Sequence, residues 1–258
     1  MENALGCCSF LSVILKRWQK TDKMHYTYLA IDLGAILVPL LATFHPRLQF
    51  YKKWPILFPA LFLSGGIFIC WDIYFTSIHV WGFNDAYITG LHIFSLPAEE
   101  VFFFLCIPYA CIFSYHCLKT LWPGFKLSQR ISAFISWIMM IGGISITIFF
   151  SHYKYPATTF LLLTIFIWYS RKRHWIGNFY LCYGIMLIPF VIVNGLLTGS
   201  WIAEPIVWYN NNEIIGLRIL TIPVEDIFYG LLMIGSQVAL YEYFAVTVAK
   251  KNACRSTI

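Results

Sequence analysis

Two short acidic motifs carry the polar chemistry of this chain. Pro97-Ala98-Glu99-Glu100 and Pro223-Val224-Glu225-Asp226 each stand at the head of a long apolar stretch. Seven of the 12 acidic residues lie in or at the edge of such stretches: Asp32, Asp72, Glu99, Glu100, Glu225, Asp226 and Glu242. No Lys or Arg lies well inside one, and a carboxyl group without a cation in an apolar medium is more stable protonated. These acids are therefore candidate proton donors.

Aromatic residues follow both motifs at helical spacing. Three and four residues after the first glutamate come Phe102 and Phe103 in one motif, and Phe228 and Tyr229 in the other. Side chains at this spacing share a helix face, and an aromatic ring stabilises a nearby cation by about 0.5 to 2 kcal/mol. The pattern indicates acid-initiated cation chemistry. The structural alternative is that proline and acids only begin and cap two helices.

The two motifs belong to an internal repeat. Residues 83–102 align without gaps on residues 209–228, and eight of these twenty positions are identical. The matched pairs include Asn84 with Asn210, Glu99 with Glu225, and Glu100 with Asp226. At an offset of 122 the preceding stretches match as well, which pairs Asp72 with Asn194 and Thr76 with Thr198. Duplication accounts for this better than chance.

Asp72 and Thr76 are four residues apart, so they share a helix face and can form a hydroxyl to carboxyl hydrogen bond. Asn194 and Thr198 repeat this spacing with a neutral amide. We expect that one half donates protons while the other only orients the substrate.

Seven apolar stretches predict an all-α integral membrane protein, since a bilayer core of about 30 Å needs roughly 20 helical residues. They are residues 26–44, 54–75, 97–118, 131–150, 156–170, 175–197 and 219–241. The fourth joins two repeats of three helices each. Because that connector is one helix, the repeats run parallel and the acid pairs lie at the same depth.

The positive charges predict the orientation. The loops after the first, third and fifth stretches and the C-terminal tail each carry three Lys or Arg, so we place them in the cytoplasm and the acid pairs on the opposite side. Lys16, Arg17, Lys20 and Lys23 conflict with this rule. The predicted organisation is an N-terminal extension (1–23), a first repeat (24–118), a connector (119–151), a second repeat (152–244) and a cytoplasmic tail (245–258).

Composition excludes several other classes. Of the 258 residues 59% are apolar and 12% are charged, against about 25% charged in a soluble domain. The net charge of +6 comes from short basic clusters, which suit a membrane surface and predict no nucleic-acid partner. The chain has no nucleotide-binding glycine motif, no zinc-protease motif and no CxxC pair, so we predict no cofactor and no metal.

The paired motifs, Pro-Ala-Glu-Glu-Val-Phe-Phe and Pro-Val-Glu-Asp-Ile-Phe-Tyr, resemble the lycopene cyclase domain of the heterodimeric, fungal and archaeal type, with two units fused in one chain. Trp71-Asp72, residues 81–84 (Trp-Gly-Phe-Asn) and residues 194–199 extend the resemblance, which covers residues 24–244. It implies a lycopene β-cyclase, an intramolecular lyase or isomerase of the cell membrane. Its partners would be lycopene, related carotenoid hydrocarbons and the lipid bilayer, and the oligomeric state stays open.

The resemblance also implies the chemistry. An acid protonates C2 of a lycopene ψ end, the 5,6 double bond attacks the C1 cation, and loss of a C6 proton closes a β-ionone ring, giving γ-carotene and then β-carotene. The implied catalytic acids are Glu99, Glu100, Glu225 and Asp226, with Asp72 from the repeat argument. Which acid is donor and which is base stays open. The predicted substrate contacts are Phe102, Phe103, Phe228, Tyr229, Trp81, Asn84, Asn194, Thr76, Thr198 and Asn210.

Two other classes share some of these features. A proton-coupled transporter also has parallel repeats and intramembrane carboxyls, but mid-span breaks at equivalent positions are expected there, and Pro108 and Pro189 are not repeat equivalents. A membrane prenyl transferase needs aspartate-rich magnesium motifs of the DxxxD kind, which this chain lacks.

Overall fold

The computed structural model describes residues 25–255, so the predicted N-terminal extension, residues 1–23, lies outside the described part of the chain. Seven α-helices occur within residues 25–255: α2 (Thr27–Ala42), α3 (Trp54–Ser77), α4 (Ala98–Leu121), α5 (Gln129–Phe149), α6 (Lys154–Ser170), α7 (Ile176–Leu197) and α8 (Val224–Arg255). Two short 3-10 helices, η1 (Phe50–Lys53) and η2 (Asp85–Tyr87), lie in the loops. The predicted all-α architecture is confirmed.

Five of these helices are long and apolar enough to cross a membrane: α3 with η1, α4, α5, α7 and α8. The other two, α2 and α6, have 16 and 17 residues, fewer than the roughly 20 that a bilayer core requires. The membrane-type fold is therefore confirmed, and five of the seven predicted spans meet the length and composition of a crossing.

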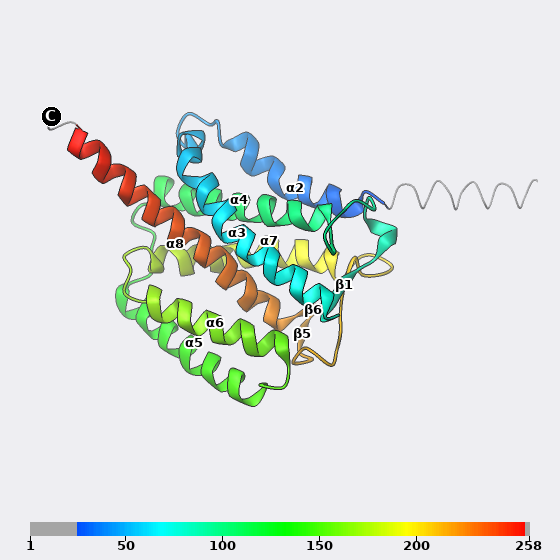
Figure 1. Cartoon of the computed structure of the whole chain (residues 1–258). Helices are drawn as coiled ribbons and strands as arrows, with labels where there is room; N and C mark the ends of the chain where they lie inside the picture. The colour runs from blue at the N-terminus through cyan, green and yellow to red at the C-terminus, as the bar shows by residue number, and fades with distance from the viewer. Residues whose placement is uncertain (1–24, 256–258) are drawn as a thin grey trace, which may run out of the picture.

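The helices of the two repeats interlock. Within each repeat the first helix packs against the third, α2 against α4 and α6 against α8. The middle helices cross over to the other repeat, so that α3 packs against α8 and α7 packs against α4. The connector α5 packs on α6 at the edge of the bundle (Figure 1). Each half thus completes the helix packing of the other.

A small β-ribbon joins the two halves at the end of the bundle that carries both acid motifs. Its strands, β1 (Trp81–Phe83) and β4 (Val207–Tyr209), are antiparallel, with Gly82 opposite Trp208. At the repeat offset of 126 this pairing maps onto itself, so the pseudo-twofold axis passes between Gly82 and Trp208. A Cβ atom on Gly82 would lie 2.3 Å from the Trp208 ring, so only glycine fits there. The ribbon therefore pairs equivalent residues of the two repeats and lies at the end of the bundle where both acid motifs begin, as parallel repeats require.

Two equivalent hairpins lead directly into the acidic helices. Strands β2 (His92–Ile93) and β3 (Leu96–Pro97) precede α4, and strands β5 (Arg218–Ile219) and β6 (Ile222–Pro223) precede α8. The prediction that the last helix begins at Ile219 is wrong, because residues 219–223 belong to the second hairpin. Leu220 turns this hairpin at φ 57°, outside the helical region, and α8 begins only after Pro223.

Candidate active site

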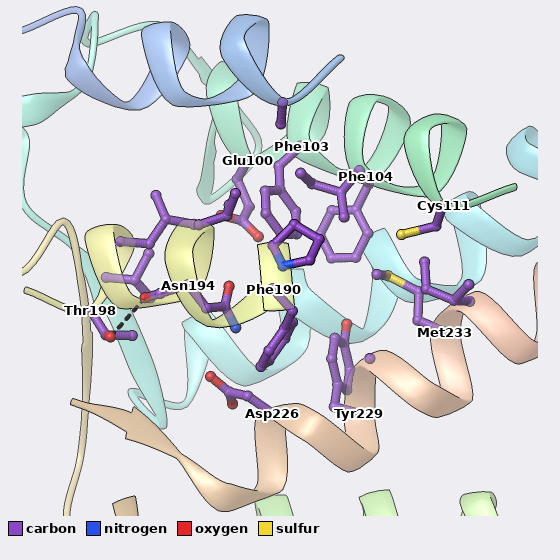
Figure 2. Close-up of a pocket in the computed structure, with 18 of the residues that line it drawn as sticks. Glu100, Phe103, Phe104, Cys111, Phe190, Asn194, Thr198, Asp226, Tyr229 and Met233 are labelled. Atoms are coloured by element: carbon purple, nitrogen blue, oxygen red, sulfur yellow. Dashed lines mark hydrogen bonds between the residues drawn. The ribbon is translucent and has the colours of Figure 1, made fainter. Parts of the chain in front are cut away.

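A cavity of about 270 Å³ lies among helices α2, α3, α4, α7 and α8, below the β-ribbon. Three of the predicted acids line it: Asp72 from α3, Glu100 from α4 and Asp226 from α8. All three are less than 10% exposed. Figure 2 shows Glu100 and Asp226 reaching into the cavity from helices of different repeats. The site is therefore shared between the two halves.

Tyrosines from the beginning of the first helix of each repeat hold Glu100 and Asp226. The Tyr28 hydroxyl donates to Oε2 of Glu100. The Tyr155 hydroxyl donates to Oδ1 of Asp226 at 2.7 Å, and Tyr209 donates to Oδ2 at 2.8 Å. Burial, and then the charge of Asp226, raises the pKa of Tyr209, which keeps this hydroxyl a donor. Asp226 thus accepts two hydroxyl hydrogen bonds, and Glu100 accepts one.

The third acid, Asp72, is held by the ribbon. The indole Nε1 of Trp81 donates to Oδ1 of Asp72 at 2.6 Å. The expected hydrogen bond from Thr76 is wrong, because Thr76 Oγ1 and Asp72 Oδ2 are both buried without a partner among residues 25–255. Trp81 lies nine residues further along the chain, and the ribbon returns it to the cavity, whereas Thr76 does not line the cavity.

The second repeat supplies neutral groups at the corresponding positions. Asn194 of α7 and Thr198, which directly follows this helix, both line the cavity, and Figure 2 shows the Asn194 side chain pointing into it. The Thr198 hydroxyl lies 2.7 Å from the Asn194 backbone oxygen and 2.7 Å from the Thr221 hydroxyl, so it bonds backbone and loop instead of the Asn194 side chain.

Glu99 and Glu225 are buried but do not line the cavity. Each accepts a hydrogen bond from a backbone N–H ten residues earlier: Glu99 Oε1 from Thr89 at 2.7 Å, and Glu225 Oε1 from Ile215 at 2.5 Å. The second oxygen of each has no partner among residues 25–255. These two glutamates therefore tie the loops before the hairpins to the starts of α4 and α8.

We expect Glu99→Gln and Glu225→Gln to alter stability more than chemistry. Glutamine keeps an acceptor for the loop N–H but places an NH₂ group where the buried second oxygen of the carboxyl lay, so each change should cost about 1 kcal/mol of unfolding free energy. Thermal unfolding of the purified protein in detergent measures this cost. The rate at which lycopene, the substrate implied by the resemblance, is converted should stay near wild type for equal amounts of folded protein. A large loss of conversion in well-folded protein would move these glutamates into the reaction site.

Of the four aromatic residues predicted to contact the substrate after the acid motifs, two line the cavity and two do not. Phe103 and Tyr229 line the cavity, one turn after Glu100 and Asp226. Phe102 lies in an outer groove between α3 and α4, and the Phe228 ring packs on Phe160 with 4.7 Å between centroids. In each predicted pair the second ring therefore faces the cavity.

The loop asparagines also lie outside the cavity lining. Asn84 Oδ1 accepts from the Ala86 N–H at 3.1 Å, and Asn210 Oδ1 accepts from the Asn212 N–H at 3.0 Å. Such bonds to a backbone N–H two residues on are typical of turns, so both asparagines shape the loops after the ribbon strands.

Three residues of the site were not predicted from the sequence: Tyr28, Tyr155 and Tyr209. Tyr28 and Tyr155 are 127 residues apart and precede Glu100 and Asp226 by 72 and 71 residues, so they occupy equivalent places in the repeats. Extending the repeat alignment back to the first helices would have paired them.

The cavity is long and apolar beyond its acidic end. On α4 its lining runs from Glu100 to Ser114, about 20 Å at the helical rise. The side chains beyond the acids are mainly apolar: Ile107, Met186, Phe190, Met233 and Ile234. This shape suits a linear hydrocarbon whose end meets the carboxyls.

A family model described as lycopene cyclase matches residues 25–118 and 152–244, which together are most of the chain. The chain belongs to the lycopene cyclase family. The two matched segments contain helices α2–α4 and α6–α8, so this cyclase holds two family units in one chain, as the sequence motifs predicted. No curated protein and no solved structure matched the chain. The family supports a carotenoid cyclase in an apolar membrane environment.

Proposed function

We propose that the protein is a lycopene β-cyclase that converts ψ ends of lycopene into β-ionone rings without a change of redox state. The observation that carries this proposal is the placement of Glu100 and Asp226, from opposite repeats, at one end of a long apolar cavity. Both carboxyls can reach a single hydrocarbon end there.

We assign the proton donor to Glu100. It accepts one hydroxyl hydrogen bond, and it shares the cavity with the carboxyl of Asp72. Two carboxyl groups in one apolar site disfavour a second negative charge, which keeps a proton on the pair. The Glu100 carboxyl gives its proton to C2 of the ψ end, and the positive charge develops at C1.

Ring closure follows from this cation. The electron pair of the 5,6 double bond forms the C1–C6 bond, which moves the positive charge to C5. The rings of Phe103, Tyr229 and Trp81 line the cavity and can stabilise the cation through their π faces. The apolar lining keeps water from capturing it.

We assign the base to Asp226. Its two tyrosine hydrogen bonds favour the charged carboxylate. Arg218 adds a positive charge nearby, since its guanidinium carbon lies 6.0 Å from the ring of Tyr209, which itself donates to Asp226. Asp226 takes the C6 proton, and the C6–H electrons form the 5,6 double bond of the β ring. One proton enters and one leaves, so the product is an isomer of the substrate.

The basic loops support a membrane orientation with the C-terminus in the cytoplasm and the acidic end of the cavity on the opposite side. The substrate would then reach the site from the hydrocarbon layer.

Expression in a lycopene-accumulating host tests this function. Chromatography of the pigments should show γ-carotene and β-carotene in cells that make the protein and only lycopene in cells with the empty vector. Unchanged lycopene beside a normal level of the protein in the membrane would contradict the proposal. A proton-coupled transporter would leave the pigments unchanged.

A further inference from the structure

The cavity reaches the outer surface of the protein between α2 and α7. Its lining includes Ala35 and Pro39 from α2, and Pro189, Phe190 and Val193 from α7. Pro189 is exposed on the outside of the bundle although it also lines the cavity. The inner space and the outer surface therefore meet at this residue.

The surface around this opening is apolar. Exposed side chains flank it on both helices: Leu33, Leu37 and Val38 on α2, and Ile185, Ile188 and Ile192 on α7. Helix α7 contains no charged residue, and the one charged residue of α2, Asp32, is buried. Because α7 is one of the helices able to cross a membrane, such a surface faces hydrocarbon, not water.

Both walls of the opening contain a proline within the helix. Proline has no N–H, so Pro39 and Pro189 cannot complete the helical hydrogen bonds to the carbonyls of Ala35 and Ile185. Helix α2 packs mainly against α4 and has little contact with α7. The two walls are thus weakly tied to each other at the point where the cavity opens.

The pseudo-symmetric place on the other side of the bundle is closed. Phe166 follows Pro39 by 127 residues, the same separation as that of Tyr28 and Tyr155, so it is the equivalent of Pro39 in the second repeat. It packs so closely on α8 that a Cβ atom on Gly235 would lie 2.6 Å from its ring. Tyr155 is the one α6 residue among the described residues that line the cavity, and Asp72 is the one from α3. The opening is a feature of the α2–α7 side.

We propose that a linear polyene hydrocarbon enters the cavity from the bilayer between Ala35, Pro39 and Pro189, and that the unreacted part of the chain stays in this opening. This inference rests on the proposed cyclase function. One end of the hydrocarbon lies at Glu100 and Asp226, while the rest of the hydrocarbon extends toward the lipid. A substrate with two reactive ends must therefore leave after the first ring and return in the opposite direction.

A matched pair of variants on neighbouring residues tests the opening. Ala35→Phe places a ring in the opening, whereas Gly34→Phe places the same ring on the exposed face of α2, where a Cβ atom has nothing within 4 Å. Ala35→Phe should lower conversion by at least about tenfold, the scale of an overpacked site, and Gly34→Phe should match wild type. Both are compared in lycopene-containing vesicles at equal amounts of folded protein.

The ratio of one-ring to two-ring product separates this role from a general loss of activity. A β ring is wider than an open ψ end, so a narrowed opening should raise the one-ring share, compared at equal total conversion. Ala35→Leu gives the same readout if Ala35→Phe does not fold. Equal ratios and rates in the Ala35 and Gly34 variants would overturn the proposed opening. A wild-type protein that forms no rings would instead overturn the proposed function.

Discussion

Glu100→Gln is expected to lower the rate of ring formation by at least about 100-fold, the low end of what a general acid contributes. Glutamine keeps the shape of the side chain and an acceptor for the Tyr28 hydroxyl, but it has no proton to give to C2. Turnover of lycopene by the purified variant in vesicles measures the effect. Because Glu100 lines the cavity and its partner remains, the fold should persist.

The adjacent Glu99 provides the control for this variant. Glu99→Gln makes the same chemical change one residue away, on a side chain that bonds the Thr89 N–H and does not line the cavity. Its rate should stay close to wild type. A loss in Glu99→Gln with normal turnover in Glu100→Gln would reverse the assignment of the donor.

Asp226→Asn should cause a loss of similar size, at least about 100-fold, because an amide is a very poor base for the C6 proton. Asparagine keeps one oxygen acceptor, so at least one of the two tyrosine hydrogen bonds can persist. Glu100 still donates in this variant, and the C5 cation can lose a proton from a neighbouring carbon instead. The residual product should therefore contain rings whose double bond is misplaced, which chromatography and absorption spectra distinguish.

Tyr209→Phe is the matched control for Asp226. It removes one of the two hydrogen bonds and leaves the carboxylate, so it should slow the reaction less than Asp226→Asn and retain the β ring as its product. Turnover of Asp226→Asn at the wild-type rate, with the β ring as product, would show that another group takes the C6 proton.

Much of the site was predictable because the repeat is gapless where the acids lie. The 126-residue offset identified the two acid pairs, and the offset of 122 in the preceding stretches led to Asp72 and Asn194. The motif could not show which acid of each pair faces the cavity. That depends on the rotation of α4 and α8, which is set by their packing against helices of both repeats.

The incorrect and missing sequence predictions also arise from contacts between residues that are far apart in the chain or from structure that hydropathy does not mark. Spacing allowed a bond between Asp72 and Thr76, but the pairing of β1 with β4 brings Trp81 to Asp72 instead. Residues 219–223 are as apolar as a helix start, and hydropathy alone does not separate that from a buried hairpin. Tyr28 and Tyr155 act on acids about 70 residues away, so no local pattern marks them.

Cyclisation in heavy water tests the central claim most directly. The purified protein is equilibrated in D₂O vesicles, given lycopene without any electron acceptor, and the products are analysed by mass spectrometry. Proton entry at C2 and proton loss at C6 predict rings that each carry one deuterium, with no other change of mass relative to lycopene. Products that lack deuterium after full equilibration, or that have lost two hydrogens, would contradict a reaction driven by exchangeable carboxyl protons.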